Sequence, residues 1–245
     1  MRSMRVPLTL LMLAIPMVPS SAQDPVHVNP RSVSVAFEDA RVRVLRTLYA
    51  PHEKVALHAH PAIAGVSITA SHLRITPSGG TPLEISRSAG EVYWSEPTAH
   101  SVESLSDEPT ETIEIEFKSA SQSAIESVQH EPAPKIPPGG PLAVEEEPHH
   151  HLVYQNQYVR MLEVRLAPGE TTEFHTHSHD NLAVRLSEAV VTRQDQGKDW
   201  VPPSKVVPGE VSLTKGAESP YTHRVKNVGN TPFRVIDVEL LQPAH

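Results

Sequence analysis

Residues Phe37–Pro51 read FEDARVRVLRTLYAP, and residues Tyr154–Pro168 read YQNQYVRMLEVRLAP, 117 positions later. Both stretches carry an arginine at the same place, Arg43 and Arg160, and both end in Ala-Pro. A repeat unit of about 90 residues is too long for a solenoid, and it is close to the size of a small domain. The sequence therefore predicts two tandem copies of one domain, and the matched arginines suggest a structural ion pair that both copies share.

The composition favours a chain of many short strands. It has 24 prolines, 11 glycines and repeated short runs of valine, isoleucine and leucine, a combination typical of all-β domains. The strands expected in the first unit are Val42–Tyr49, Lys54–His60, Ala64–Thr76, Pro82–Arg87, Glu91–Glu96, His100–Leu105 and Glu111–Lys118.

The same patterns divide the chain into four parts. We assign residues 1–22 to a signal peptide, 31–118 to the first domain, 119–148 to a linker and 149–242 to the second domain. The linker contains EPAPKIPPGGP, and proline cannot join a central ladder of strands. One or two helical turns are possible over Ser121–Gln129.

The first 22 residues have the features of a secretory signal. Arg2 and Arg5 precede the mostly apolar run Val6–Val18, and small residues lead to an expected cleavage after Ala22. The apolar run is shorter than the 18 or more residues of a spanning helix. We therefore expect a periplasmic or secreted protein, without a membrane anchor after cleavage.

Charge and cysteine content exclude several functions. The net charge of −8 becomes about −10 when the two arginines of the signal are lost, and this acidity argues against nucleic-acid binding. The chain has no cysteine, which excludes disulfides, thiolate ligands and cysteine nucleophiles. The expected partner is a small-molecule substrate, with a homo-oligomer as a further possibility.

The repeat also duplicates a pattern of histidines. His58-Ala59-His60 recurs as His175-Thr176-His177, and a later single histidine follows each pair, His100 and His223. Residues i and i+2 of a strand point to the same face, so each pair directs two imidazoles towards one point. Neutral imidazole is a common ligand of zinc, copper, iron and nickel.

These motifs resemble those of the cupin superfamily, and of a two-domain bicupin in particular. Gly169, five residues and His175-x-His177 match the first cupin motif, while Gly209, His223 and Asn227 match the second. The first unit carries a degraded copy, in which His52 takes the place of the glycine before His58-x-His60. The resemblance covers nearly all of the chain after the signal and implies two jelly-roll barrels, each with histidines inside.

The sequence departs from the cupin pattern at one ligand. Typical cupins have a glutamate four or five residues after the second histidine, where this chain has Ala64 and Gly65, then Asn181 and Leu182. The resemblance therefore implies one divalent metal for each functional barrel, held by three neutral histidines, with iron or copper favoured over manganese, nickel or zinc. Such sites occur in cupin dioxygenases and not in typical oxalate decarboxylases.

The second unit is the stronger candidate for the metal. The segment after His60, Pro-Ala-Ile-Ala-Gly-Val, offers no polar partner to orient the ligands of the first site, so metal binding there stays open. In the second unit, His179 and Tyr221 are candidates for proton transfer, although His179 could equally lie on the barrel rim. The His149–His151 run is either an accessory metal patch or the end of the linker.

Two classes of function remain open on the sequence. The first is an exported metal-dependent oxygenase or oxidoreductase that acts on a small organic molecule or a carbohydrate. The second is a protein that binds a metal or a small ligand without catalysis. Isomerase or lyase activity on sugar acids is a further alternative, because a cupin fold does not decide the chemistry.

Overall fold

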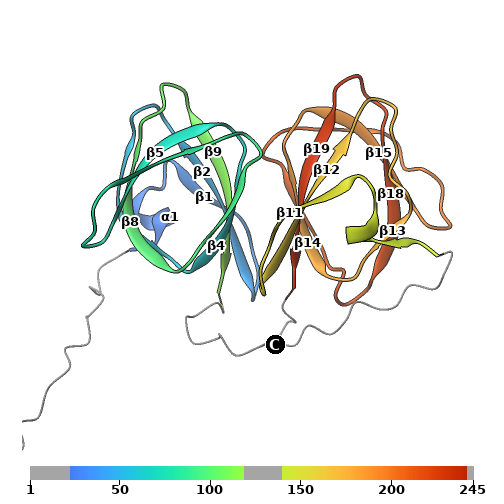
Figure 1. Ribbon diagram of the computed structural model, residues 1–245, viewed down its shortest axis with the longest axis horizontal. Helices are drawn as coiled ribbons and strands as arrows, with labels where there is room; N and C mark the ends of the chain where they lie inside the picture. Colours follow the sequence, from blue (N-terminus) through green and yellow to red (C-terminus); the bar gives the residue numbers. More distant parts are fainter. Residues whose placement is uncertain (1–22, 119–139, 242–245) are drawn as a thin grey trace, which may run out of the picture.

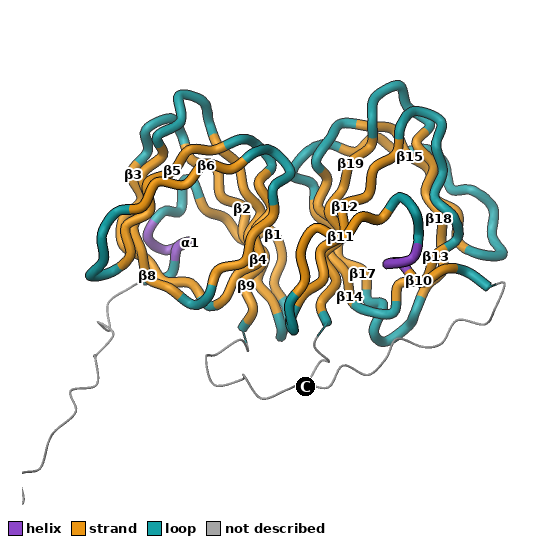
Figure 2. Tube along the Cα trace, viewed as in Figure 1, coloured by secondary structure: helices purple, strands orange, loops and turns teal. Residues whose placement is uncertain are grey.

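The computed structural model describes residues 23–118 and 140–241, which form two β-barrels side by side (Figures 1 and 2). This confirms the prediction of an all-β chain with two tandem barrels. The expected signal peptide, 1–22, and the linker segment 119–139, with its possible helical turns, lie outside the described residues. Within the described residues, no helix is long and apolar enough to cross a membrane.

The first barrel consists of two sheets and a short helix, α1 (Pro25–Val28). One sheet has the order β1-β2-β9-β4-β7 and the other has the order β3-β8-β5-β6. The strands are β1 (Val33–Glu38), β2 (Val42–Tyr49), β3 (Lys54–His60), β4 (Ala62–Ser67), β5 (Ser71–Pro77), β6 (Leu83–Arg87), β7 (Val92–Ser95), β8 (Thr98–Ser104) and β9 (Thr110–Phe117).

The second barrel repeats this topology. Its sheets have the orders β11-β12-β19-β14-β17 and β10-β13-β18-β15-β16, and a 3₁₀ helix, η1 (Val144–Glu146), precedes β11. The strands are β10 (Leu142–Ala143), β11 (His150–Gln155), β12 (Val159–Leu166), β13 (His175–His177), β14 (Asp180–Arg185), β15 (Ala189–Asp195), β16 (Ser204–Val206), β17 (Val211–Thr214), β18 (Tyr221–Asn227) and β19 (Phe233–Leu240).

Strand register makes the two barrels equivalent residue by residue. Val33 pairs with Thr47 on β2, and its counterpart His150 pairs with Val164 on β12. Both of these strand pairs shift register at the same point, after Val35 and after Leu152. His52 and Gly169, which the repeat aligns, both have a positive φ, 57° and 87°. The turn before β3 thus keeps the left-handed conformation although it has lost its glycine.

The longest expected strand, Ala64–Thr76, is wrong as a single element. It is two strands, β4 and β5, separated by a bend at residues 68–70. β4 belongs to the five-stranded sheet and β5 to the four-stranded sheet. The chain must therefore turn between them, and a hydrophobicity pattern that continues through Ile68 does not reveal the turn.

The end of the assigned linker belongs to the second barrel. β10 pairs in parallel with β13, with Leu142 opposite His175. Val144 of η1 is only 1% exposed. In the first barrel the chain just before α1 takes the same position, since Gln23 bridges to His58. Each barrel therefore has a leading segment that lies against its His-x-His strand.

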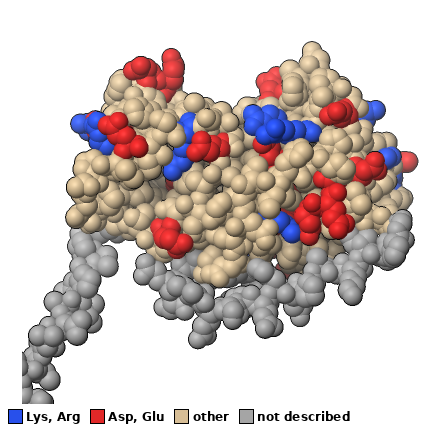
Figure 3. Space-filling view, viewed as in Figure 1, with Lys and Arg blue, Asp and Glu red and all other residues tan. Residues whose placement is uncertain are grey.

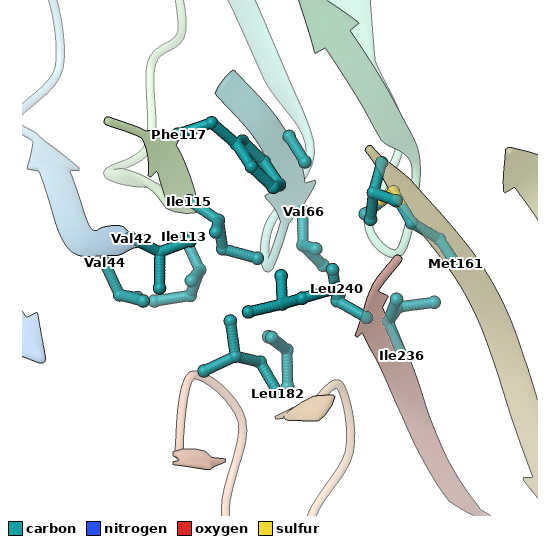
Figure 4. Packing of buried hydrophobic residues seen from close by; sticks show 14 of the residues in the cluster. Val42, Val44, Val66, Ile113, Ile115, Phe117, Met161, Leu182, Ile236 and Leu240 are labelled. Atoms are coloured by element: carbon teal, nitrogen blue, oxygen red, sulfur yellow. The ribbon is translucent and has the colours of Figure 1, made fainter. Parts of the chain in front are cut away.

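The two barrels share one apolar core. The five-stranded sheets face each other and bury side chains from both halves of the chain (Figure 4). Ile113 and Ile115 of β9 meet Leu182 of β14 and Ile236 of β19, all completely buried. Full burial of one such side chain contributes about 1.5–3 kcal/mol, so this contact holds the barrels together.

Polar groups frame this contact. Arg41 of the first barrel pairs with the buried carboxylate of Asp180 in the second, and Lys215 bridges back to Asp39 at 2.9 Å. Trp94 stacks on Tyr158 across the boundary, with ring centroids 5.4 Å apart. On the face drawn in Figure 3, acidic and basic side chains form small interspersed groups.

Candidate metal centres

Three histidines converge inside the first barrel. His58 and His60 lie on β3, and His100 lies opposite His58 on β8. Their ring centroids are 4.8–5.3 Å apart, and both histidines of β3 are buried. Nδ1 of His58 hydrogen-bonds the Ala56 carbonyl oxygen at 2.8 Å, which leaves Nε2 available to a metal.

The first site does have a polar partner, contrary to the expectation from the residues after His60. Glu116 of β9 accepts a hydrogen bond from His60 Nδ1 at 2.9 Å. Arg43 binds the other oxygen of Glu116 at 2.5 Å and also bridges to Asp24. This confirms the ion pair expected from the repeated arginines. Burial works to lower the pKa of His60, but the hydrogen bond to Glu116 and the negative charges of Glu114 and Glu116 together raise that pKa.

The second barrel brings together the expected triad. His175 and His177 lie on β13, and His223 pairs with His175 across β18. Nε2 of His175 and Nε2 of His223 are 3.0 Å apart. Two ligands at adjacent positions of an octahedral metal with bonds of about 2.1 Å are about 3 Å apart. Nδ1 of His175 donates to the Glu173 carbonyl oxygen at 2.9 Å, so its Nε2 faces the centre of the site.

A fourth histidine lies in this cluster, and it belongs to the His149–His151 run that the sequence left as either an accessory metal patch or the end of the linker. His150 begins β11, and its ring is 4.5 Å from that of His175. One nitrogen each from His150, His175 and His177 lie within 4.8 Å of one another. Alternation along β11 could have placed the His150 side chain inside the barrel, but three consecutive histidines do not show which of them faces the interior.

Two carboxylates hold His150. Nδ1 lies 2.6 Å from Glu147, and Nε2 lies 3.6 Å from Asp237. Burial opposes the charged form, but the two nearby carboxylates, Asp237 and Glu147, together raise the pKa of His150 to about 9. Burial likewise opposes the charged form of Glu147, yet its bonds to His150 and His149 lower its pKa to about 2.

The expected triad is held in the neutral form that a metal requires. Burial, followed by the charge of His150, lowers the pKa of His175 to about 4. Burial, followed by the charge of His175, lowers the pKa of His223 to about 2. Burial also lowers the pKa of His177 well below its ordinary value.

Buried atoms without partners mark the same site. Nδ1 of His177 and Nδ1 of His223 have no hydrogen-bond partner in the described part of the chain. Glu239 Oε1 also lacks a partner and lies 3.9 Å from His177 Nδ1, where the first barrel has the 2.9 Å bond between His60 and Glu116. Burial raises the pKa of Glu239 to about 7, although Arg160 acts to lower it. The donor set and its carboxylate partners fit a divalent metal.

The histidines of the second barrel open onto a cavity of about 300 Å³. Several valines and Phe233 form much of its wall, and Arg185 and Arg193 are also among its lining residues. Arg185 Nε is buried without a hydrogen-bond partner among the described residues. The cavity therefore offers an apolar enclosure with cationic groups next to the histidines.

Matched positions in the first barrel carry larger or apolar side chains. Tyr93 stands where the second barrel has Ser212, because both face equivalent positions on the neighbouring strand, Gly65 and Ala183. The Tyr93 hydroxyl donates to Glu114 at 3.0 Å, inside the barrel. The same comparison of strand register shows that Ile75 occupies the position of Arg193 and that Val33 occupies the position of His150.

Of the two proton-transfer candidates, only Tyr221 lines the cavity. Its ring stacks on His177 at 4.9 Å, and its hydroxyl donates to Asn181 at 2.9 Å. Burial, followed by the charge of Asp237, raises the pKa of Tyr221, so the phenol keeps its proton. His179 lies in the bend between β13 and β14, on the rim.

The rim position has a simple cause in the chain. Two residues separate β13 from β14, whereas one residue separates β3 from β4. This extra residue shifts the register, so that Asn181, opposite Glu239 of β19, corresponds to Ile63, opposite Glu116 of β9. A Cβ added to Gly216 would lie 2.2 Å from the His179 carbonyl oxygen, which shows how closely the rim packs there.

Comparison with solved structures decides the fold family. AerE from Microcystis aeruginosa superposes with a TM-score of 0.62 at 13% identity, over 90% of this chain and 98% of its own. An oxalate decarboxylase variant from Bacillus subtilis gives a TM-score of 0.53 at 14% identity, over 82% of this chain and 69% of its own. The protein has a bicupin fold. A salicylate 1,2-dioxygenase variant from Pseudoaminobacter salicylatoxidans superposes on the bicupin with a TM-score of 0.51 at 13% identity, covering 81% and 71% of the two chains.

Neither a protein-family model nor a curated protein sequence matches the bicupin. At these identities the structural likeness establishes the fold, while the chemistry must be argued from the site.

Proposed function

We propose that the second barrel is the catalytic site of a metal-dependent oxygenase or oxidoreductase, and that its substrate is a small organic acid. The observation that carries the proposal is the cavity of about 300 Å³, in which a cluster of buried histidines lies beside two arginines. A volume of this size is at the lower end of ligand pockets, which favours a compact substrate.

The two arginines support an acidic substrate. A guanidinium group presents several donors in a plane and suits a carboxylate. Arg193 also bonds Asp195 at 2.6 Å, whereas the Nε of Arg185 lacks a partner within the described chain. The hydrogen bonds of Arg185 go to the Ala183 carbonyl oxygen and the Ser212 hydroxyl, so its guanidinium group can bind a carboxylate without first breaking another charged contact.

The remaining groups would orient the substrate. The valines and Phe233 enclose its carbon skeleton and exclude water from it. Tyr221, whose phenol keeps its proton, can turn from Asn181 to donate to an oxygen of the substrate. A divalent metal held by the histidines would act as a Lewis acid and, if iron or copper, as a centre for electron transfer.

The missing glutamate ligand supports an oxygenase over a decarboxylase. Asn181 is the polar residue at that place, and it is neutral and bonded to Tyr221. Neutral ligands leave the charge of the metal uncompensated within its own ligand set, which favours an anionic substrate. No carboxylate in the described residues is bonded to His175, His177 or His223 within 3.5 Å.

Oxygen uptake tests this function. Iron-loaded and copper-loaded protein would be given diketones, thiols, phenolic acids and small carboxylic acids in an oxygen electrode, with sugars as the comparison class. Turnover that requires oxygen and is lost in an Arg185→Gln variant supports the proposal, with Lys205→Gln on the exposed edge strand β16 as the control. Turnover without oxygen would identify an isomerase or lyase instead, and tight metal binding without any turnover would identify a binding protein.

We also propose that the protein is exported, with Gln23 as its first residue after cleavage. The basic start and the apolar run Val6–Val18 support this, and the carbonyl oxygen of Gln23 accepts a hydrogen bond from the Ala59 backbone at 3.1 Å, within the first barrel. Mass spectrometry of the protein from the native compartment tests this. A chain that retains residues 1–22 would contradict it.

A further inference from the structure

His150 is the feature of the second barrel that neither the repeat nor the cupin resemblance explains. Its counterpart in the first barrel is Val33, a core residue that is 2% exposed. A buried histidine at this place costs desolvation energy unless its nitrogens are partnered. In this protein both nitrogens face a group that attracts positive charge.

We propose that His150 is a fourth metal ligand of the second barrel, held in place by Glu147. This rests on the proposed metal function of the same site and adds one protein group to its coordination sphere. The four imidazoles would then come from three strands, β11, β13 and β18, with neutral Asn181 left where typical cupins have a glutamate.

Distances support the assignment. Nδ1 of His150 is taken by Glu147 at 2.6 Å, so Nε2 is the nitrogen left for a metal. One nitrogen each of His150, His175 and His177 lie within 4.8 Å. Opposite ligands of a metal with bonds of about 2.1 Å are about 4.2 Å apart. The three nitrogens therefore need only small side-chain adjustments to share one ion.

Glu147 is built as a support for the ligand. It is 1% exposed, and besides His150 it accepts hydrogen bonds from the backbone N–H of His149 and of Glu173, both at 3.0 Å. The Glu173 carbonyl oxygen in turn binds Nδ1 of His175. One carboxylate thus fixes His150 and, through residue 173, the strand of the HxH pair. A carboxylate behind a metal-bound histidine is a recurrent arrangement in metalloproteins.

The charge around His150 favours a cation. Asp237 lies 3.6 Å from Nε2, and Glu147 lies on the other side of the ring. A divalent ion at Nε2 would therefore gain the attraction of both carboxylates. The first barrel has a glutamate, Glu114, at the position of Asp237, but there it bonds Tyr93.

Counting ligands by spectroscopy tests the proposal. The experiment uses the full chain with His58→Gln and His100→Gln, which confines the metal to the second barrel. Copper(II) would be bound, its affinity measured by competition with a chelator, and its imidazole nitrogens counted by pulsed electron paramagnetic resonance. We expect four imidazoles in this parent protein.

Three variants complete the test. His150→Val, which restores the residue of the first barrel, should reduce the count to three and weaken copper binding by about tenfold or more. Glu147→Gln should keep four imidazoles and weaken binding by about 10–100-fold. His151→Val, at an exposed neighbouring position, should change neither quantity.

A count of three in the parent protein overturns the proposal, even if a variant fails to fold. An affinity of the His150→Val variant within twofold of the parent also overturns it and leaves His150 as a proton donor beside the site. These outcomes are independent of turnover. A protein with four imidazoles and no oxygen uptake would refute the proposed oxygenase but not the ligand.

Discussion

Exchanging one pair of matched residues between the barrels tests why the second barrel encloses a cavity where the first barrel contains the Tyr93 side chain. In the first barrel Tyr93 lies over Gly65, and a Cβ added there would lie 2.1 Å from the tyrosine ring. In the second barrel the same two positions are Ser212 and Ala183. We therefore expect Ser212→Tyr to bring a tyrosine ring against the methyl group of Ala183.

The cost follows from this contact. A separation of 2.1 Å is far inside ordinary carbon contact, so either the ring or β14 must move, and overpacking of this kind costs about 1–3 kcal/mol. Ala183→Gly alone costs about 0.5–1 kcal/mol, because glycine is disfavoured in a strand. The double variant restores the geometry of the first barrel, and the carboxylate of Asp237 can accept a hydrogen bond from the new tyrosine hydroxyl. We expect the double variant to be destabilised by at least 1 kcal/mol less than the sum of the two single-variant costs.

Guanidinium unfolding of the four proteins of this cycle measures the coupling free energy, and metal content is measured in parallel. We expect the double variant to keep its metal and to lose binding of small carboxylates, because the ring occupies the cavity. If the two single-variant costs add up to the cost of the double variant within about 0.5 kcal/mol, the reasoning is refuted. In that case the tyrosine does not enter the barrel.

Three further predictions concern the two sites. Replacing both histidines of β13 by alanine should remove the more tightly bound metal equivalent, measured by elemental analysis; its loss from the matching β3 variant instead would mean that we have chosen the wrong barrel. Glu116→Gln should cost about 3 kcal/mol of unfolding free energy, because it removes a buried carboxylate from His60 and leaves Arg43 with only the more exposed Asp24 as a charge partner; Glu84→Gln, at an exposed pair, should cost much less, and equal costs for the two would contradict this. In metal-free protein, His150 has a higher pKa in the folded state than its unfolded value of about 6.5, so its protonation stabilises the fold below that pH, and this contribution is lost as the pH rises towards about 9. The difference in melting temperature between the parent and a His150→Val variant should therefore shrink over that interval. A constant difference would show that His150 is not charged.

The fold was accessible from the sequence because two independent patterns agree. The repeat gave the domain count, and the short strands between prolines gave the class, so β2 and β3 were expected with the bounds that they have. The division between β4 and β5 was not accessible. It depends on the chain passing from one sheet to the other, which is set by long-range strand pairing, and Ile68 is not a typical turn residue that would mark this point.

The site was accessible in part for a similar reason. Spacing of i and i+2 on a strand brings together His175 and His177, and the repeat adds His223. His150 could not be chosen in this way, because its role depends on register with β12 and on Glu147, which directly follows η1. Glu116 was missed because its partner His60 is 56 residues away.

The common core of the barrels governs how this gene can vary. Deletion of the first barrel would leave Leu182 and Ile236 exposed to water, so purifying selection must preserve the outer wall of that barrel whether or not its histidines hold a metal. Its interior is under a different constraint, since the buried ion pair of Glu116 and the apolar packing keep that barrel folded without any need for a cavity. Among descendants of this chain we therefore expect more variation around Tyr93 than among the β9 side chains of the common core.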